Sequence, residues 1–395
     1  MAALQIYDPR ERAVVAALDR VVGAGVALGR LFRGRRRRPA APRRILLMRI
    51  ERIGDLLMAL PAIRDVRALA PHADIDLVVG SWNNGLAQAI PFVTRVLTMD
   101  AGWLARGGAA QNLGSLVKTA RSWAARQYDL AINFEPDLRS NYFLAQSGAK
   151  WTVGYRSGGG GALLDVALDY DPRAHTTANA RRLVEAAFEQ TADAASVAPA
   201  LLAIPPRAEE FAREVLGSAQ RPLVGVHTSG GREIKQWDPG RFAAVARRLV
   251  QERHATIVLT GSREDRGLVD GVKAQLPAER TVDLTGRGDL VETAAILERL
   301  DLLITGDTGP MHLAAAVGTP IVAVFGPSDP ARYAPQGPLD RVVRIDLPCA
   351  PCNRIRLPPA RCAGHIPDCL AGIDADRVYD AAAAALDATV VPRRA

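Results

Sequence analysis

Two loops that combine glycine with a carboxylate carry the residues best suited to chemistry. Gly54 and Asp55 follow the apolar run 45–50, and residues 306–312 read Gly-Asp-Thr-Gly-Pro-Met-His after the apolar run 302–305. Each pattern predicts a strand that turns into a helix, whose N-terminal amides favour anions such as phosphate. Two such turns, one in each half of the chain, predict a cleft between two similar domains that handles sugar hydroxyls and phosphates.

Asp55 is a candidate general base. Ligands bind at the carboxyl ends of parallel strands, and a carboxylate there can take a proton from a hydroxyl within hydrogen-bond reach. Aspartate is also a preferred helix N-cap, so the local sequence alone favours a capping role for this residue.

The loop 227–235, which reads His-Thr-Ser-Gly-Gly-Arg-Glu-Ile-Lys, is a candidate phosphate cradle. The hydroxyls of Thr228 and Ser229 and the glycine amides can position a phosphate, and Lys235 can offset charge on a leaving group. The loop lacks the P-loop spacing, which argues against ATPase chemistry. An ordinary surface lysine is the alternative interpretation of Lys235.

The turn 306–312 is the most specific of these patterns. Asp307 can accept hydrogen bonds from sugar hydroxyls or cap the helix, Thr308 can cap it, and Gly309 lets a ligand approach the backbone. His312, one turn further on, can donate to phosphate or have a purely structural role.

A fourth candidate is Glu264, which follows the apolar run 256–260. Acidic residues after the second strand of nucleotide-binding sheets contact ribose hydroxyls, and we prefer Glu264 to Asp265 for this contact. The general preference for acidic residues at helix starts explains both nearly as well.

The elements that must position these residues follow a strand–helix alternation. Short continuous apolar runs between amphipathic stretches predict parallel sheets buried on both faces, and hence an α/β protein of two doubly wound, Rossmann-like domains. We place these at 44–205 and 206–395, because Pro205 and Pro206 interrupt the pattern. The predicted strands are 45–50, 75–79, 128–134, 223–227, 256–260, 281–284, 302–305 and 321–325, and the predicted helices are 54–70, 239–252, 264–275, 290–300 and 310–317.

The glycine run 158–161 is either a flexible turn or a mobile loop over an acceptor.

A basic N-terminal extension, residues 1–43, precedes the first domain. Residues 1–44 contain eleven arginines against three acidic residues, which accounts for the whole formal net charge of +8, so the folded body has no basic excess that would favour nucleic acid. The segment 13–32 is too charged to span a bilayer, but its apolar residues can line one helix face in a membrane interface while arginines such as 35–38 reach anionic headgroups. A helix packed on the protein, followed by a solvated run of charge, is the alternative. No secretory signal is visible, which predicts a cytoplasmic protein.

Four cysteines, Cys349, Cys352, Cys362 and Cys369, lie in the segment 349–369. A cytoplasmic location argues against disulfides, and the spacing is compatible with a structural, four-coordinate zinc ion. Packed free thiols are the alternative.

Taken together, the motifs resemble those of the heptosyltransferases, a family of inverting glycosyltransferases. The resemblance covers about residues 44–385 and is carried by residues 49–61, by the loop that ends Lys235-Gln236-Trp237, by residues 306–313, and by Pro-Ile-Val-Ala-Val-Phe-Gly-Pro at 320–327.

The resemblance implies a GT-B fold, with the acceptor on the N-terminal domain, a nucleotide sugar on the C-terminal domain and the active site in a central cleft. It implies that Asp55 is the general base, that Lys235 assists the departing nucleotide diphosphate, and that Asp307, Thr308, Gly309 and His312 contact the donor. It also implies ADP-heptose as donor, a lipid A-linked lipopolysaccharide core as acceptor, and work at the cytoplasmic face of the inner membrane, with no cofactor required. Glu51 departs from the small or polar residues of close relatives. The alternatives are another nucleotide sugar for a different surface glycan, or a non-catalytic sugar-nucleotide-binding scaffold.

Overall fold

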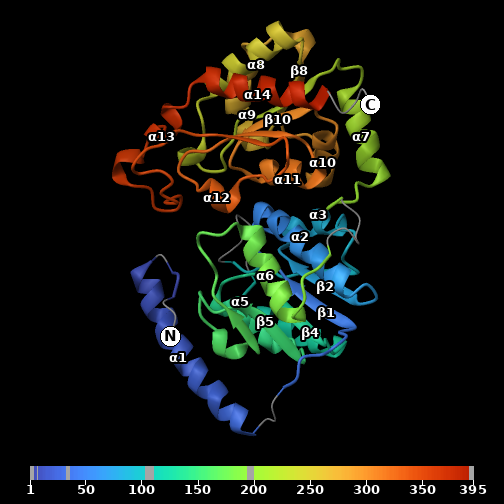
Figure 1. Cartoon of the computed structure of the whole chain (residues 1–395), viewed down its shortest axis with the longest axis vertical. Helices are drawn as coiled ribbons and strands as arrows, with labels where there is room; N and C mark the ends of the chain where they lie inside the picture. The colour runs from blue at the N-terminus through green and yellow to red at the C-terminus, as the bar shows by residue number, and fades with distance from the viewer. Residues whose placement is uncertain (1–3, 7, 33–35, 103–110, 194–199, 391–395) are drawn as a thin grey trace. The chain divides into compact units, whose positions relative to one another are not determined.

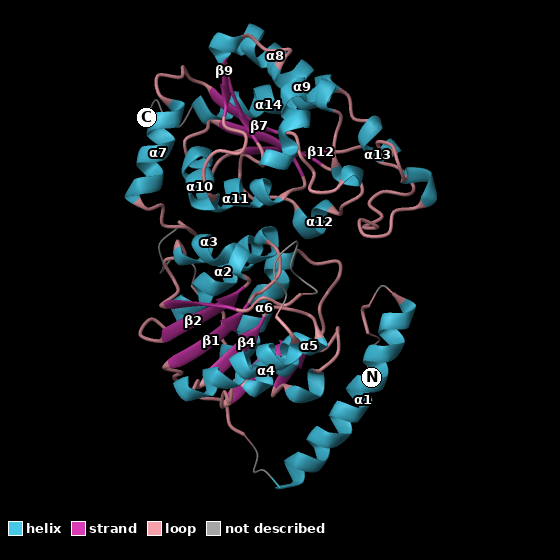
Figure 2. Cartoon of the chain, turned by 180° about the vertical axis from the view of Figure 1, so that it is seen from behind, coloured by secondary structure: helices cyan, strands magenta, loops and turns pink. Residues whose placement is uncertain are grey.

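The computed structural model describes residues 4–6, 8–32, 36–102, 111–193 and 200–390. The chain divides into two compact units, Met1–Leu201 and Leu202–Ala395. Each unit contains one six-stranded parallel sheet with helices on its faces, as Figure 2 shows in magenta and cyan. This confirms the predicted α/β class with two doubly wound domains, the pair that forms a GT-B fold. The division falls four residues before Pro206, where the first helix of the second unit begins.

The first unit has the strand order β3-β2-β1-β4-β5-β6. Strands β1 and β4 are neighbours, and chain connections leave them in opposite directions across the sheet. The residues of β1 and β4 are buried almost throughout, as expected for strands covered on both faces. The elements of this unit are α1 (Pro9–Phe32), β1 (Arg44–Met48), α2 (Ile53–Leu69), β2 (Asp74–Val79), α3 (Asn84–Gln88), β3 (Arg95–Thr98), α4 (Leu113–Ser122), β4 (Leu130–Asn133), α5 (Leu138–Gln146), β5 (Trp151–Tyr155), β6 (Val166–Leu168) and α6 (Thr176–Phe188).

The second unit repeats the scheme with the order β12-β11-β10-β7-β8-β9. Its elements are α7 (Pro206–Leu216), β7 (Leu223–His227), α8 (Pro239–Arg253), β8 (Thr256–Thr260), α9 (Arg266–Lys273), β9 (Thr281–Asp283), α10 (Leu290–Glu298), β10 (Leu302–Gly306), α11 (Gly309–Val317), β11 (Ile321–Val324), α12 (Pro330–Tyr333), β12 (Arg341–Val343), α13 (Asp368–Ala371) and α14 (Ala375–Val390). The predicted helix 264–275 is shorter, because a 3-10 turn, Arg263–Asp265, precedes α9.

Local sequence explains where several helices begin. Helix α8 has proline in its first turn, and the side chain of Asp238 before it accepts a hydrogen bond from the amide of Arg241 at 3.0 Å. Helix α10 begins with a capping box between Asp289 and Glu292. These signals determine the residue at which each helix begins. They thereby also determine where the loop between the preceding strand and that helix ends.

The N-terminal extension forms α1, the long blue helix of Figure 1. One side of α1 packs on the glycine run 158–161: the amide of Gly160 donates to Asp19 at 2.6 Å, and a Cβ atom on Gly159 would lie 2.8 Å from Val15. Gly159 and Gly160 have positive φ angles of 91° and 76°, which favour glycine. The glycine run is thus a docking point for α1.

The other side of α1 is apolar and exposed. Val14, Leu18, Val21 and Leu28 fall on one helix face, and Val21 is 72% exposed. The packed alternative is therefore confirmed, while contact with a membrane interface stays a prediction that the exposed apolar face permits. Of the predicted positions in this segment, residues 33–35 and the side chains of 29–32 lie outside the described residues. Among the described helices, none is long and apolar enough to cross a membrane.

Two arginines that we expected at a lipid surface are engaged with the protein instead. Arg36 pairs with Asp165 at 3.4 Å, and Arg38 pairs with Glu189 at 2.9 Å. Arg38 also donates to the carbonyl of Phe188 at 2.8 Å. These contacts hold the chain after α1 against the first domain, so the basic run is only partly solvated.

Candidate functional site

Asp55 lies in the first turn of α2, just after the carboxyl end of β1. The N-cap of α2 is Arg52, so the capping role that local sequence favoured for Asp55 is wrong. Its carboxylate is 26% exposed, and Oδ1 accepts a hydrogen bond from Nη2 of Arg49 at 3.3 Å. The carboxylate is therefore oriented by a neighbouring side chain and remains accessible.

Arg49 is held by the end of the adjacent strand β4. Its Nη1 donates to the carbonyl of Phe134 at 2.6 Å and to Oε2 of Glu135 at 3.1 Å. The other oxygen of Glu135 accepts from the amides of Ile50 and Glu51 at 2.7 and 3.0 Å. Sequence reasoning missed Glu135, although its position directly after the predicted strand 128–134 was a usable signal.

The charges of this cluster influence one another. Burial raises the pKa of Glu51 and of Glu135, and the two carboxyl groups also share a hydrogen bond. Burial alone would lower the pKa of Arg49, but the carboxylates of Glu135, Asp55 and Glu51 outweigh it and hold that pKa above its usual value. Arg49 therefore stays charged, and Glu51 is the carboxyl group that most readily holds a proton.

The second cluster lies in the other domain, after β7. The loop 228–235 folds back on itself, since a Cβ atom on Gly230 would lie 2.7 Å from the carbonyl carbon of Lys235. The hydroxyl of Thr228 is buried, with 2% of the residue exposed, and has no hydrogen-bond partner among the described residues. A buried hydroxyl without a partner is costly in isolation and is satisfied when a ligand supplies one.

Lys235 and Asp307 form an ion pair. Nζ of Lys235 lies 2.7 Å from Oδ2 of Asp307, and Nε2 of His312 lies 4.0 Å from Oδ1. Burial raises the pKa of Asp307, but Lys235, then His312, outweigh it and hold that pKa below its usual value. A hydrogen bond from Ser328 acts in the same direction, and this residue, at the end of the 320–327 motif, was also missed.

Thr308 and Gly309 begin helix α11. Thr308 is the N-cap, but its side chain makes no capping hydrogen bond, contrary to the capping role expected for it. Its hydroxyl lies 3.2 Å from that of Thr305. Gly309 and Pro310 then supply the first helical turn, and His312 is buried one turn along. The first amides of α11 form an anion-favouring end beside Lys235.

Both clusters lie where doubly wound sheets bind ligands. Asp55 and Glu135 follow β1 and β4, and Thr228 and Asp307 follow β7 and β10. In each sheet these are the two neighbouring strands between which the chain reverses its direction of winding. Loops leaving such a pair diverge and leave a crevice for a ligand.

The acidic run after β8 divides into two roles. Oδ2 of Asp265 accepts from the amide and the hydroxyl of Ser262, both at 2.8 Å, in a capping box. Burial raises the pKa of Asp265, but its hydrogen bonds with Ser262 and Ser229 outweigh that effect and lower it. Glu264 is exposed, and a hydrogen bond with Ser262 lowers the pKa of its carboxyl group, but Asp265 and not Glu264 closes the capping box.

His227, the last residue of β7, is a further buried polar group that sequence reasoning did not select. Its Nδ1 lies 3.2 Å from the hydroxyl of Thr260, at the end of the neighbouring strand β8. Burial lowers the pKa of His227, which favours the neutral imidazole. Its contact with Thr260 joins the ends of β7 and β8 directly before Thr228.

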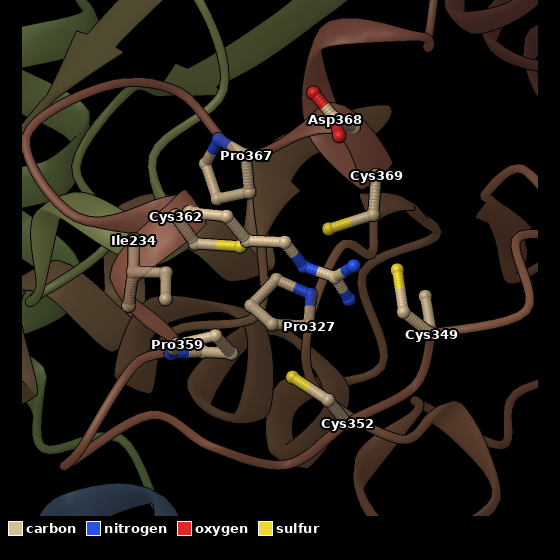
Figure 3. Close-up of a pocket in the computed structure, with 11 residues that line it drawn as sticks. Ile234, Pro327, Cys349, Cys352, Pro359, Cys362, Pro367, Asp368 and Cys369 are labelled. Atoms are coloured by element: carbon tan, nitrogen blue, oxygen red, sulfur yellow. The ribbon is translucent and has the colours of Figure 1, made fainter.

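The four cysteines line one pocket, together with Ile234 and Pro327 (Figure 3). All four are free thiols, and burial raises the pKa of Cys369 to about 11. Their soft sulfur donors suit zinc, yet within the described ranges no three or more His, Cys, Asp or Glu residues are already arranged to hold a metal ion. The structural zinc stays a prediction. Ile234 and Pro327 directly precede Lys235 and Ser328, so the chain connects the wall of this pocket to the Asp307 cluster.

The sequence pattern of glycosyltransferase family 9 (heptosyltransferase) matches residues 116–359. The lipooligosaccharide heptosyltransferase 2 of Haemophilus influenzae is 26% identical over 321 residues, covering 76% of this chain and 88% of that protein.

Solved structures show the same fold. The ADP-heptose lipopolysaccharide heptosyltransferase II of Escherichia coli superimposes with a TM-score of 0.70 at 22% identity, over 89% of this chain and 100% of that one. An E. coli heptosyltransferase with ADP-2-deoxy-2-fluoro heptose gives 0.60 at 19% identity, over 77% and 93%. The chain is a glycosyltransferase, a member of glycosyltransferase family 9, the heptosyltransferases.

Proposed function

We propose that this enzyme transfers heptose from ADP-heptose to a hydroxyl of a lipid A-linked lipopolysaccharide core, with inversion at the anomeric carbon. The donor is supported by relatives described as heptosyltransferases and by a structural neighbour described with an ADP-heptose analogue. The observation that carries the proposal is the Lys235–Asp307 pair beside the unpartnered hydroxyl of Thr228. The carboxyl ends of β7 and β10 thus offer the ammonium of Lys235, the hydroxyl of Thr228 and the first amides of α11 to a diphosphate.

The reaction is a direct displacement. Asp55 takes the proton of the acceptor hydroxyl, whose oxygen forms a bond to the anomeric carbon. The bond from that carbon to the diphosphate oxygen breaks, and its electron pair leaves with ADP. Lys235 and the amides at the start of α11 stabilise the negative charge that develops on this oxygen.

The remaining donor contacts follow from the same placement. The hydroxyl of Thr228 donates to the diphosphate and Ser229 contacts it, Asp307 and His312 contact the donor near the sugar, and Glu264 accepts from ribose hydroxyls at the end of β8. These fixed protein charges supply the electrostatic stabilisation of the leaving group, so the scheme needs no cofactor.

The test is a transfer assay with ADP-heptose and a truncated lipid A-linked core oligosaccharide, which measures released ADP and the glycosylated lipid. We expect Asp55→Asn to reduce kcat by at least about a hundredfold, the lower range for a general base, while ADP still binds. Full activity of this variant would overturn the proposed role. Turnover only with UDP- or GDP-sugars would favour the alternative of another surface glycan, and no turnover with any donor would favour the scaffold.

We also propose that the enzyme acts at the cytoplasmic face of the inner membrane and that α1 docks on anionic lipid. The exposed apolar face of Val14, Leu18, Val21 and Leu28 suits the acyl boundary of a bilayer. Arg10 and Arg20 on the same helix, and Arg37 after it, are exposed and complement anionic headgroups. Docking there would hold the enzyme beside a lipid-linked acceptor.

A further inference from the structure

We infer that Arg49, anchored by Glu135, is a positioning residue that aims the Asp55 carboxylate at the acceptor hydroxyl. The inference deepens the proposed function and rests on the role assigned there to Asp55. Neither Arg49 nor Glu135 stands among the residues that the motifs predict to act in catalysis.

A single guanidinium holds Asp55 at two points. Nε of Arg49 donates to the backbone carbonyl of Asp55 at 3.2 Å, and Nη2 donates to its Oδ1 at 3.3 Å. Arg49 is 4% exposed, so water competes little for these bonds. Because the guanidinium is a rigid planar fork, its contacts fix a direction as well as a distance.

The fork is fixed at its other end by the neighbouring strand. Nη1 donates to the carbonyl of Phe134 and to Oε2 of Glu135, at the carboxyl end of β4. Oε1 of Glu135 accepts from the amides of Ile50 and Glu51, in the loop that leads to α2. Glu135 therefore anchors both the guanidinium and the backbone that carries Asp55.

This arrangement leaves one oxygen of the base for the acceptor. Among the described residues, Oδ1 of Asp55 is engaged by Arg49, and no hydrogen bond reaches Oδ2. The acceptor hydroxyl can donate to Oδ2 and transfer its proton there as its oxygen attacks. A carboxylate free to rotate would lose part of the advantage of orientation.

The charge of Glu135 also balances the guanidinium that holds Asp55. Oε2 of Glu135 lies 3.1 Å from Nη1 of Arg49. The other titratable groups that interact with Arg49 are Glu51, which lies 3.6 Å from Nη2, and the phenols of Tyr155 and Tyr170. Burial raises the pKa of Tyr155, so this phenol is neutral, and Glu135 and Asp55 provide the main compensating charge.

The experiment compares Arg49→Lys and Glu135→Gln in the transfer assay with ADP-heptose and truncated lipid A-linked core. Lysine keeps the charge but cannot span Asp55, Phe134 and Glu135 together, so we expect kcat to fall at least tenfold with unchanged ADP affinity. Glutamine at position 135 keeps a side-chain oxygen that can accept from the amides of Ile50 and Glu51, but it removes the negative charge. We expect its kcat to fall with unchanged ADP affinity, because the guanidinium that orients Asp55 loses its charged anchor.

Arg67→Lys is the matched control. Arg67 donates to the carbonyls of Phe92, Pro71 and Ala73 in the same domain and makes no contact with the Asp55 cluster. Its replacement loses comparable backbone contacts, so a purely structural effect would appear there too. We expect this variant to keep the wild-type kcat, with circular dichroism checking the fold of all variants.

The outcomes separate the two proposals. Full activity of Asp55→Asn would overturn the role of Asp55 and this inference with it. Loss of activity in Asp55→Asn together with wild-type kcat in both Arg49→Lys and Glu135→Gln would overturn this inference alone. If Arg49→Lys does not fold, Glu135→Gln decides, because a wild-type kcat in that variant excludes an anchoring role for Glu135.

Discussion

Nζ of Lys235 lies 2.7 Å from Oδ2 of Asp307, so two residues separated by about seventy positions in the chain form one ion pair at the β7–β10 edge. A diphosphate bound at this edge competes with Asp307 for the ammonium. The carboxylate meanwhile keeps the lysine side chain in place, which lowers the entropy lost when phosphate binds. Lys235 and Asp307, for which the sequence predicts separate roles, thus interact directly.

Lys235→Ala should weaken ADP binding by at least about tenfold. A hydrogen bond to a charged group contributes about 1.5–3 kcal/mol, and 1.4 kcal/mol corresponds to tenfold in affinity. Calorimetric titration with ADP, UDP and GDP measures the effect and the nucleotide preference together. Lys273→Ala is the control, because Lys273 also pairs with an aspartate, Asp283 at 2.9 Å, but away from the β7–β10 edge. Equal losses in both variants would contradict the assignment.

Asp307→Asn should reduce the dependence of stability on acid pH. The folded-state pKa of Asp307 lies below the ordinary value of 3.8, so its ion pair contributes stability that is fully present above that value. This contribution is lost as pH falls through the lowered folded-state pKa. Urea unfolding between pH 7 and pH 3 should give a shallower acid decline for the variant. A decline as steep as in wild type would show that Asp307 is not held by Lys235.

Gly230→Ala should damage the donor loop. The new Cβ atom would lie 2.7 Å from the backbone of Lys235 and 2.8 Å from Gln236, and backbone cannot move aside as a flexible side chain can. We expect a loss of about 1–3 kcal/mol in the free energy of unfolding, with weaker ADP binding. Gly271→Ala is the control, since nothing lies within 4 Å of its added Cβ and it sits inside α9. That change should stabilise the protein by about 0.5–1 kcal/mol.

Leu18→Glu and Val21→Glu should remove binding to anionic vesicles. Both residues belong to the exposed apolar face of α1, and a carboxylate there opposes both burial in lipid and attraction to anionic headgroups. Co-sedimentation with phosphatidylcholine vesicles containing phosphatidylglycerol measures the effect. Leu113→Glu, at another exposed leucine, should bind as wild type does. Unchanged binding of the α1 variants would exclude this face as the docking surface.

The cysteine pocket should contain one zinc ion per chain if the predicted structural metal binds there. Elemental analysis of protein purified without added metal tests this, with Cys349→Ser and Cys352→Ser as variants that remove thiolate ligands. Removal of the ion by a chelator should weaken ADP binding, because Ile234 and Pro327 link the pocket to the loops of Lys235 and Ser328. Metal-free protein with wild-type thermal stability and ADP affinity would favour packed free thiols.

Much of the fold follows from local sequence. Strands β7 and β8 have the predicted bounds, because their apolar residues are contiguous and breakers flank them. Short edge strands such as β6 and β12 were not predicted, since a strand of three residues is too short to carry a periodic signal. Asp55 was correctly placed after a strand, yet its capping alternative failed, because the cap depends on backbone angles that the sequence pattern does not specify.

The sequence by itself determined the class of fold, the order of the motifs and the residue types at both strand ends. The tertiary structure decided which of these residues meet: Arg49 with Glu135 across β1 and β4, and Lys235 with Asp307 across β7 and β10. The physical reason is the range of the interactions. Periodicity and capping act within a few residues of the chain, whereas these pairs depend on which strands become neighbours in a sheet, and that is settled by packing the whole domain.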